Sequence, residues 1–295
     1  MTEPRLSVVV ASVNGLPYLA DCLDALERTA PWAEAIVADS TDEATRAKVR
    51  ESWPAVRLLS FETPLTVPEL RAAGLAAATA PYIALIEDHC VVRAGWAERI
   101  VRRHEEGHAV VGGPIHNAVD HRVRDWAAFF CEYSAYLEPG PAGPAPGLPG
   151  MNVSYDRRAV AEIADLLAEG RWETWLHARL LERGFELWAD PELVIDHAKD
   201  FDLREFLSQR YHYSRSYAGM RNAELGWKRA LYIAASPLLP VLLYTRIGGN
   251  VLRAGGHART LAAATPLVLL YLAVWTVGEA VGYAFGGGRS LLEVR

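Results

Sequence analysis

Three consecutive side chains that can hold a metal ion follow one short apolar segment. Glu87, Asp88 and His89 come directly after the run 82–86, which is typical of a buried strand. Carboxylate oxygens suit hard cations such as Mg²⁺, and an imidazole shifts the preference towards Mn²⁺. A divalent ion here could neutralise a diphosphate and stabilise it as a leaving group. The alternative is a polar cap on the strand, without a metal.

A second histidine follows a later apolar segment. His197 ends the run 193–197, with Asp196 before it. Alone it is typical of an ordinary hydrogen-bonded histidine. Beside Asp88 and His89 it could complete the metal site.

Two further acidic residues stand where strands or helices are expected to begin or end. Asp39 ends the apolar run 35–38, where its carboxylate could bind a base or ribose or cap the following helix. Glu173 opens a predicted helix, where the helix dipole favours a carboxylate in any protein. It could instead take the proton from an acceptor hydroxyl.

Two arginines lie close together on a predicted helix near the end of the polar part of the chain. Arg210 and Arg215 belong to a helix expected over residues 203–221. Their guanidinium groups could hold phosphate. The alternative is an interfacial helix that precedes a membrane segment.

The elements that must position these residues alternate regularly through the first 112 residues. Strands are expected over 6–12, 35–38, 56–61, 82–86 and 109–111, and helices over 18–27, 42–52, 67–78 and 95–106. Such alternation with apolar strands predicts a mostly parallel sheet covered on both faces. Ligands bind at the carboxyl ends of such strands, where Asn14, Asp39 and residues 87–89 fall.

A segment rich in proline and glycine follows. Nine of the thirteen residues in 138–150 are Pro or Gly, which predicts neither helix nor regular strand. It is either a linker or a flexible loop over a site. Beyond it we expect helices over 158–169 and 172–183 and a strand within 187–197.

The last part of the chain is apolar and basic. Residues 228–295 hold seven Lys/Arg and two Asp/Glu, whereas residues 1–227 carry a net charge of −11. The acidic folded part argues against nucleic acid as a partner, and the basic tail favours an anionic membrane face. We therefore expect a domain over 1–227 and a membrane-anchoring segment over 228–295.

Two apolar stretches, 230–245 and 261–285, lie in that segment. The second is long enough for a transmembrane helix, which needs roughly 20 apolar residues. We expect a helical hairpin with both ends in the cytosol. The alternatives are one interfacial or re-entrant helix with one span, and a soluble apolar bundle.

The cysteines and the start of the chain bear on the compartment. Cys22, Cys90 and Cys131 lie far apart, which excludes a zinc-finger or disulfide framework and fits a reducing compartment. No secretory signal precedes the first strand, so we expect the folded domain to be cytoplasmic, attached to the cell membrane.

Taken together, these residues resemble the family-2 inverting glycosyltransferases of the GT-A fold over about residues 6–221. The first strand and its turn, the strand that ends at Asp39, and Arg71 ahead of residues 87–89 are similar to the family's nucleotide-sugar site. The resemblance implies binding of a UDP-linked sugar by Ser12, Asn14, Asp39, Arg71, Glu87 and Asp88. It implies Mn²⁺ or Mg²⁺ at Asp88, His89 and His197.

The second half of the resemblance concerns the acceptor. Asn152 and Trp172 are similar to residues on the family's acceptor side, and Glu173 takes the role of catalytic base because Thr174 replaces the family's aspartate. The family's reaction transfers the sugar to a hydroxyl with inversion. With a membrane tail, the acceptor is expected to be a glycan or lipid-linked molecule of cell-envelope polysaccharide or glycolipid synthesis.

Two other functions remain open. The replaced aspartate and the altered metal motif also fit a membrane scaffold that keeps the nucleotide-sugar fold without turnover. A nucleotidyltransferase is a weaker alternative because residues 12–17 contain no basic side chain.

Overall fold

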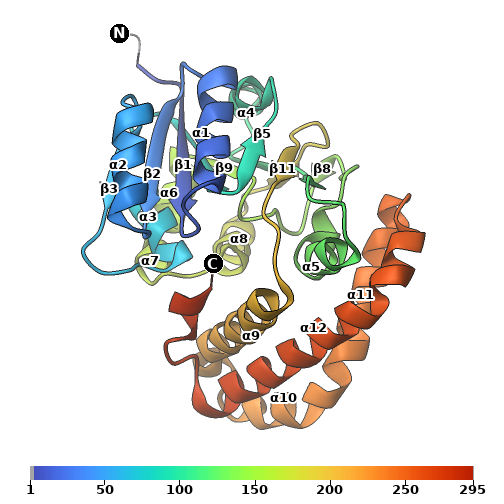
Figure 1. Ribbon diagram of the computed structural model, residues 1–295. Coiled ribbons are helices and arrows are strands. Elements are labelled where there is room, and N and C mark those ends of the chain that lie inside the picture. The colour runs from blue at the N-terminus through green and yellow to red at the C-terminus, as the bar shows by residue number, and fades with distance from the viewer. Residues whose placement is uncertain (1–2, 295) are drawn as a thin grey trace. The chain divides into compact units, whose positions relative to one another are not determined.

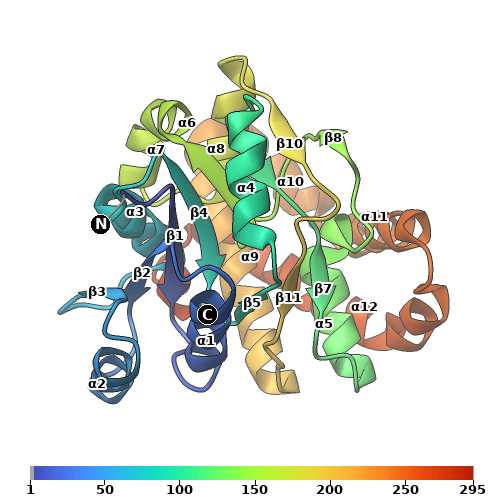
Figure 2. The same ribbon diagram turned by 90° about the horizontal axis from the view of Figure 1, so that it is seen from above.

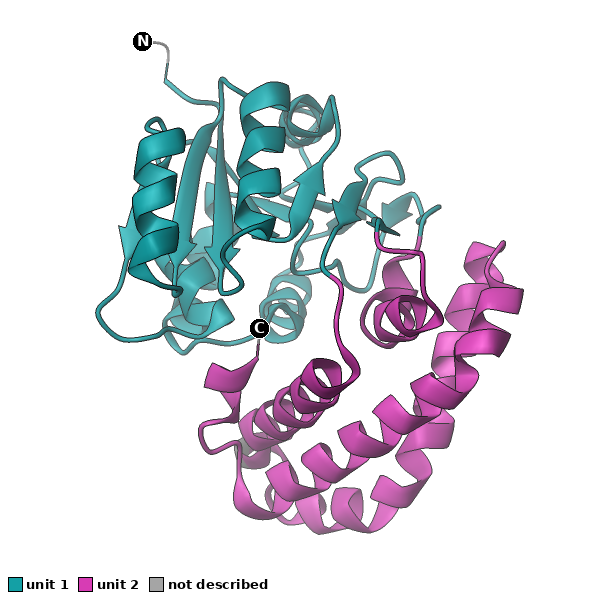
Figure 3. Ribbon diagram, viewed as in Figure 1, with its two compact units in different colours: residues 1–118, 138–199 teal, residues 119–137, 200–295 magenta. Residues whose placement is uncertain are grey.

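The computed structural model describes residues 3–294, apart from the side chain of residue 223. The chain divides into two compact units (Figure 3): unit 1 holds residues 1–118 and 138–199, and unit 2 holds residues 119–137 and 200–295. This division differs from the expected boundary after residue 227. The reason is that α9 (Leu203–Leu225) packs along α12 (Ala258–Phe285) and so belongs with the apolar helices.

Unit 1 is built on a mixed sheet with the strand order β3-β2-β1-β4-β9-β6-β10-β8 (Figures 1 and 2). Its strands are β1 (Leu6–Ser12), β2 (Glu34–Asp39), β3 (Arg57–Ser60), β4 (Tyr82–Glu87), β6 (Val110–Gly112), β8 (Gly143–Pro144), β9 (Val153–Asp156) and β10 (Leu187–Ala189). A small second sheet consists of β5 (Cys90–Val92), β11 (Ile195–His197) and β7 (Ile115–Asn117).

The helices of unit 1 are α1 (Tyr18–Thr29), α2 (Glu43–Ser52), α3 (Val67–Ala77), α4 (Trp96–Glu105), α6 (Arg157–Glu162), α7 (Ala164–Ala168) and α8 (Glu173–Glu182). The expected α/β fold of GT-A type is confirmed. β1 to β4 form the parallel half, with β1 buried along its whole length. Strands buried on both faces consist almost entirely of apolar residues, as this one does.

Several elements differ from the expectation. β9 runs antiparallel between β4 and β6, and no strand was expected there. The expected strand within 187–197 is two strands in different sheets. Between them lies the buried Asp190, which pairs with Arg99 and Arg103. The Pro/Gly-rich segment 138–150 contains β8, which pairs with β10 at the edge of the sheet.

Unit 2 consists of helices. These are α5 (Val123–Tyr133), η1 (Ser134–Tyr136), α9, η2 (Gly226–Lys228), α10 (Arg229–Ala235), η3 (Ser236–Leu238), α11 (Leu239–Ala254), α12 and η4 (Ser290–Glu293). Within this unit α12 packs against α9, α5, α11 and α10 (Figure 1). The α5 helix was not expected from the sequence. Residues 226–254 and 258–285 are long and apolar enough to cross a membrane, by length and composition alone.

Candidate functional site

The carboxyl ends of three neighbouring strands bring predicted site residues into one row. Ser12 of β1 pairs in register with Asp39 of β2, and Ala11 pairs with Glu87 of β4. The Ser12 hydroxyl is buried and makes no hydrogen bond within the described residues. The sequence therefore placed these side chains correctly at one edge of the sheet.

Asp88 is fully buried and holds the turn that follows β1. The backbone N–H groups of residues 13–15 donate to its Oδ2 at 2.7–3.1 Å, and Asn14 Nδ2 donates to its Oδ1 at 2.8 Å. Burial opposes ionisation of this carboxyl, but its contacts with His89 and Asn14 prevail and keep its pKa below the usual value. Both oxygens of this carboxylate therefore accept hydrogen bonds from the protein itself.

His89, by contrast, has a ring nitrogen without a hydrogen-bond partner among residues 3–294. Nε2 of His89 is buried, makes no hydrogen bond within the described residues, and lies 3.5 Å from Oε2 of Glu87. The His197 ring meets the His89 ring edge-on, with 4.7 Å between centroids. Burial, with His89 and Lys199 nearby, holds the pKa of His197 well below its usual value. Neutral imidazoles are the form that binds metal.

This arrangement fits a divalent ion that is shared with a ligand. Among residues 3–294, no three His, Cys, Asp or Glu side chains are grouped closely enough to hold a metal ion by themselves. Sites for Mg²⁺ often use one or two protein ligands and complete the shell with substrate phosphates and water. Glu87 and His89, one carboxylate and one orphaned imidazole, match such a partial site.

Lys199 is a site residue that sequence reasoning missed. It is only 4% exposed, and its Nζ donates to Oδ1 of Asn14 at 2.7 Å. Asn14 Nδ2 in turn lies 3.4 Å from Nδ1 of His89. A buried ammonium is therefore held beside the histidine pair. Its position two residues after His197, just past a buried strand, was the available signal.

Arg71 joins the end of β4 to the start of α8. It is buried, and its Nη2 donates to Glu87 Oε1 at 2.5 Å while its Nη1 donates to Glu173 Oε2 at 3.0 Å. Burial opposes the charge on Arg71, but the two carboxylates prevail and raise its pKa. Its guanidinium also lies over the Trp172 ring, 5.8 Å from the centroid.

Glu173 is the first residue of α8 and retains partial access to solvent, its side chain being 22% exposed. Oε1 of Glu173 makes no hydrogen bond within the described part of the chain. Gly150 lies so close that a Cβ there would be 2.7 Å from the Glu173 carboxylate. The Pro/Gly-rich segment therefore ends directly against this ion pair.

A buried pair lies behind Glu173 on the same helix. Tyr155 Oη and His177 Nε2 are 2.9 Å apart, and His177 is one turn after Glu173. Burial lowers the pKa of His177 to about 4, so this histidine is neutral at pH 7. Burial also raises the pKa of Tyr155, and the Glu173 charge adds to that shift.

Other predicted site residues are engaged in holding the fold. Asp39 accepts from the backbone and hydroxyl of Thr41 and pairs with Arg46 at 2.8 Å. Asn152 is fully buried, accepts from Trp96 at 3.0 Å, and donates to two backbone carbonyls. These contacts fix the β2 turn and the position of β9.

The two arginines predicted to contact phosphate have partners inside unit 2. Arg210 is buried, pairs with Glu132 at 3.1 Å, and lies 4.2 Å from the centroid of the Trp275 ring. Arg215 donates to the carbonyl of Gly286 at 3.2 Å. Both guanidinium groups thus have partners within unit 2, and their phosphate role stays a prediction.

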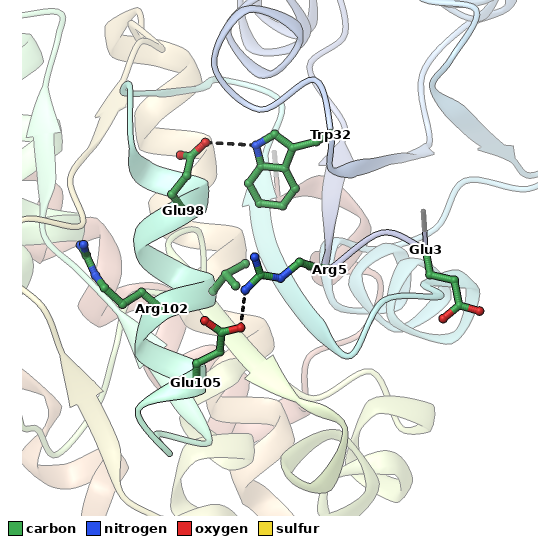
Figure 4. A pocket seen from close by; sticks show the side chains of 7 residues that line it. Glu3, Arg5, Trp32, Glu98, Arg102 and Glu105 are labelled. Atoms are coloured by element: carbon green, nitrogen blue, oxygen red, sulfur yellow. Dashed lines mark hydrogen bonds and ion pairs between the residues drawn. The ribbon is translucent and has the colours of Figure 1, made fainter. Parts of the chain in front are cut away.

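A hollow of about 700 Å³ lies elsewhere on unit 1, against α4 (Figure 4). Trp32 Nε1 donates to Glu98 at 3.0 Å across it, and Arg5 pairs with Glu105. None of the predicted site residues lines it. The hollow is therefore separate from the row of residues at the carboxyl ends of the strands.

The fold is shared with solved glycosyltransferases. The mannosyltransferase PcManGT from Pyrobaculum calidifontis, solved with GDP-Man and Mn²⁺, superposes with a TM-score of 0.59 at 17% identity over 94% of this chain and 87% of that chain. TarS (residues 1–349) from S. aureus gives 0.52 at 13% identity over 94% and 89%.

GalNAc-T7, solved with UDP, GalNAc and Mn²⁺, gives a TM-score of 0.51 at 14% identity over 67% of this chain and 44% of that chain. Among curated proteins, none matches the sequence significantly.

The family of the chain is shown by a match between its sequence and a family model. Residues 7–163 match glycosyl transferase family 2, and this match covers more than half of the chain. It includes the parallel half of the sheet and residues 87–89. The resemblance inferred from the motifs is thereby confirmed, and the chain belongs to glycosyl transferase family 2.

Proposed function

We propose that this protein transfers a sugar from a nucleoside diphosphate sugar to a hydroxyl acceptor, with inversion at the anomeric carbon. The observation that carries the proposal is the buried Arg71, which ties Glu87 at the donor end of the sheet to Glu173 at the start of α8. One residue thus sets the spacing between the candidate metal ligand and the candidate base. Positioning of this kind accounts for a large part of enzymatic rate enhancement.

The donor diphosphate binds beside Glu87, His89 and Lys199 in this proposal. A divalent ion, Mn²⁺ or Mg²⁺, would be held by Glu87 and His89, with His197 beside them, and would neutralise the charge of the leaving diphosphate. Asp88, whose carboxylate is occupied by the turn after β1, orients Asn14 rather than binding the ion. Lys199 adds a fixed positive charge on the phosphate side.

Glu173 receives the proton of the acceptor hydroxyl. Its Oε2 is fixed by Arg71, which leaves Oε1 for the acceptor. The hydroxyl oxygen attacks the anomeric carbon as the bond to the diphosphate breaks, and a single displacement inverts the configuration. The Arg71 ion pair and the adjacent Gly150 restrict the carboxylate to one orientation.

The acceptor is proposed to be a glycan or lipid-linked molecule at the cytoplasmic face of the cell membrane. Support comes from the two apolar segments of unit 2, each of membrane-spanning length and composition. Such a location suits synthesis of cell-envelope polysaccharide or glycolipid. The resemblance implies a UDP-linked donor, whereas PcManGT was solved with GDP-Man. Measuring the affinities for UDP and GDP distinguishes the two.

The test uses water as a substitute acceptor. A panel of UDP- and GDP-linked sugars is incubated with the detergent-purified protein, and the anomeric configuration of the released sugar is followed by NMR. We expect an α-linked donor to give the β-sugar first. Release with retained configuration would contradict the mechanism.

Replacement of the base supplies the second half of this test. Glu173→Gln should lower turnover by about 10²–10⁴-fold, the usual contribution of a general base, while nucleotide affinity stays the same. Glu182→Gln, an exposed site at the other end of α8, is the matched control and should leave turnover unchanged. Full activity of Glu173→Gln would remove the assigned base.

A non-catalytic scaffold remains the second candidate. Thr174 occupies the place of the family's aspartate, and that observation favours it. It predicts nucleotide binding without any release of sugar from the whole donor panel.

A further inference from the structure

The outward face of α12 is apolar along nearly its whole length. The exposed residues between Arg259 and the end of the helix recur at helical spacing and carry no charge; they are Ala262, Ala263, Pro266, Leu269, Leu270, Ala273, Val277, Ala284 and Phe285. Phe285 is 82% exposed and Val277 is 56% exposed. An exposed apolar face of this length marks a contact with another apolar phase.

The same apolar exposure continues on α10, η3 and α11. Leu238 is 70% exposed, Val241 66% and Leu242 55%, and Trp227 at the start of this region is 75% exposed. Tryptophan is enriched at the level of lipid head groups. The outer surface of unit 2 is therefore apolar over several helices.

The inward face of α12 holds the polar groups instead. Glu279 is buried and accepts from Trp275 at 2.7 Å and from Tyr283 at 2.8 Å. Tyr283 Oη also accepts from Arg221 of α9 at 2.8 Å. The rest of the inward face is mostly apolar. Because the outer face beyond Arg259 carries no charge either, α12 lacks the charged outer face of a helix in a water-soluble protein.

The partner of that inward face is itself a polar helix. A Cβ on Gly278 would lie 2.1 Å from the Ser214 hydroxyl, and one on Gly282 would lie 2.4 Å from the Arg215 carbonyl, so α9 lies directly against α12. Farther towards the start of α9, Arg210 stacks on Trp275. The α9 helix thus follows the second half of α12. It carries four arginines, and three of them, Arg210, Arg215 and Arg221, contact α12 or the residue that follows it.

This pairing argues against a lone transmembrane α12. Moving α12 through a bilayer would carry α9 and its arginines into the hydrocarbon, where a charged side chain is costly. The connector between α11 and α12 is also flanked by Arg253 and Arg259, which oppose its transfer across a membrane.

We propose that unit 2 lies in the plane of the membrane, with the outer faces of α10, α11 and α12 in one leaflet and no segment crossing the bilayer. The lipid surface is anionic: six exposed Lys/Arg residues and one exposed Glu lie on the described residues 226–294. Arg253 and Arg259 then reach head groups on the same side as the rest of the chain. This proposal differs from the expected hairpin of two spans.

The test is the sidedness of the α11–α12 connector in cells. Cys131, which is partly exposed, is first replaced by serine; Cys22 and Cys90 are buried and stay. Ala258→Cys then reports the connector and Thr63→Cys, in an exposed loop of unit 1, reports the cytoplasmic side. A membrane-impermeant maleimide is applied to intact spheroplasts and to inverted membrane vesicles.

We expect both cysteines to be labelled in inverted vesicles and neither in spheroplasts. Labelling of Ala258→Cys from the side opposite to Thr63→Cys would establish a spanning hairpin and overturn the proposal. Sugar transfer is not measured here, so failure of this proposal leaves the proposed reaction untouched.

A second arm uses the purified chain and vesicles. Flotation with phosphatidylcholine vesicles should increase at least tenfold when a third of the lipid is phosphatidylglycerol. Leu270→Glu, which places a charge on the outer face of α12, should abolish flotation, whereas Thr63→Glu should not. Equal flotation of Leu270→Glu and the unchanged chain, or no flotation of the unchanged chain with either vesicle, would overturn the proposal.

Discussion

Asp88 and His89 are neighbours in the chain, but their side chains differ in how many hydrogen bonds they make. The Asp88 carboxylate accepts hydrogen bonds from the turn after β1 and from Asn14, whereas His89 Nε2 is buried without one. An unsatisfied buried polar atom costs roughly 1–3 kcal/mol, and a bound ligand removes that cost. His89, whose ring nitrogen has this cost, is therefore the better candidate ligand.

Lys199 gives a prediction at this scale. Lys199→Met should weaken binding of the nucleoside diphosphate by about 10- to 100-fold, because hydrogen bonds to charged groups contribute roughly 1.5–3 kcal/mol. Binding of the nucleoside alone should not change. Calorimetry without added metal measures both affinities.

Two variants accompany this measurement. Lys199→Arg keeps the charge and should restore most of the affinity, and Lys48→Met, on the half-exposed outer face of α2, should have no effect. Equal weakening of nucleoside and nucleoside diphosphate by Lys199→Met would refute the phosphate role.

The sequence reached some of these residues and not others for a physical reason. Glu87 and His89 follow an apolar strand, and Glu173 begins a helix, so local pattern alone places them. Arg71 was named only through the family resemblance, because its helix gives no local sign of its two carboxylate partners, which are 16 and 102 residues away. Such long-range pairs form only when the fold brings α3, β4 and α8 together.

At the scale of elements, α3 is the part that positions Arg71. Its start is fixed by a capping box in which Thr66 and Glu69 exchange hydrogen bonds. Gly74 allows the helix to lie directly on the sheet, because a Cβ there would be 2.1 Å from Cγ1 of Val9. Arg71 lies three residues before Gly74, on the same face of α3.

Gly74→Ala should therefore affect both stability and turnover. Overpacking of this kind costs about 1–3 kcal/mol, and the displaced α3 would pull Arg71 away from Glu87 and Glu173. Thermal unfolding should occur at a lower temperature, with turnover lowered in the protein that remains folded. Gly248→Ala, where a Cβ meets nothing within 4 Å, is the control. An unchanged melting temperature for Gly74→Ala would contradict this packing.

Element boundaries were predictable where the pattern was strong and local. The strand over 6–12 and the helix that starts at residue 67 lie where the sequence placed them. The short β9, β7 and β11 were missed or merged because strands of three or four residues leave little periodicity. Their positions depend on pairing with distant strands.

At the scale of the whole molecule, unit 1 contains two buried histidines whose pKa values fall to about 4 because of burial, His104 and His177. The unfolded chain binds protons at these sites below its ordinary pKa of about 6.5, and the folded protein does not. Stability is therefore full above pH 6.5 and is lost as the pH falls towards 4, by up to about 1.4 kcal/mol per pH unit for each histidine.

We predict that the melting temperature of unit 1 drops between pH 7.5 and pH 5. Tryptophan fluorescence measures the melting temperature at each pH. The double variant His104→Gln and His177→Gln should melt with a shallower pH dependence, whatever its melting temperature at pH 7.5, and the buried His197 supplies part of the slope that remains. His121→Gln, whose side chain is 82% exposed, should keep the original slope. An unchanged slope in the double variant would assign the pH dependence to other groups.

The sequence could separate a polar domain from an apolar tail but not locate the division. Composition changes at residue 228, whereas the compact units divide at residue 200 and assign α5 to the second unit. The inner face of α12, which includes the buried Glu279, packs on α9, and composition cannot show that contact.

The central claim is a donor site built on Glu87 and His89, and calorimetry tests it most directly. UDP and GDP are titrated into the detergent-purified protein with and without Mn²⁺, alongside His89→Ala and the exposed control His121→Ala. We predict that one nucleotide binds more tightly with Mn²⁺, and that His89→Ala loses this gain while His121→Ala keeps it. Absence of binding by either nucleotide with any metal, or a Mn²⁺ effect that survives in His89→Ala, would contradict the account.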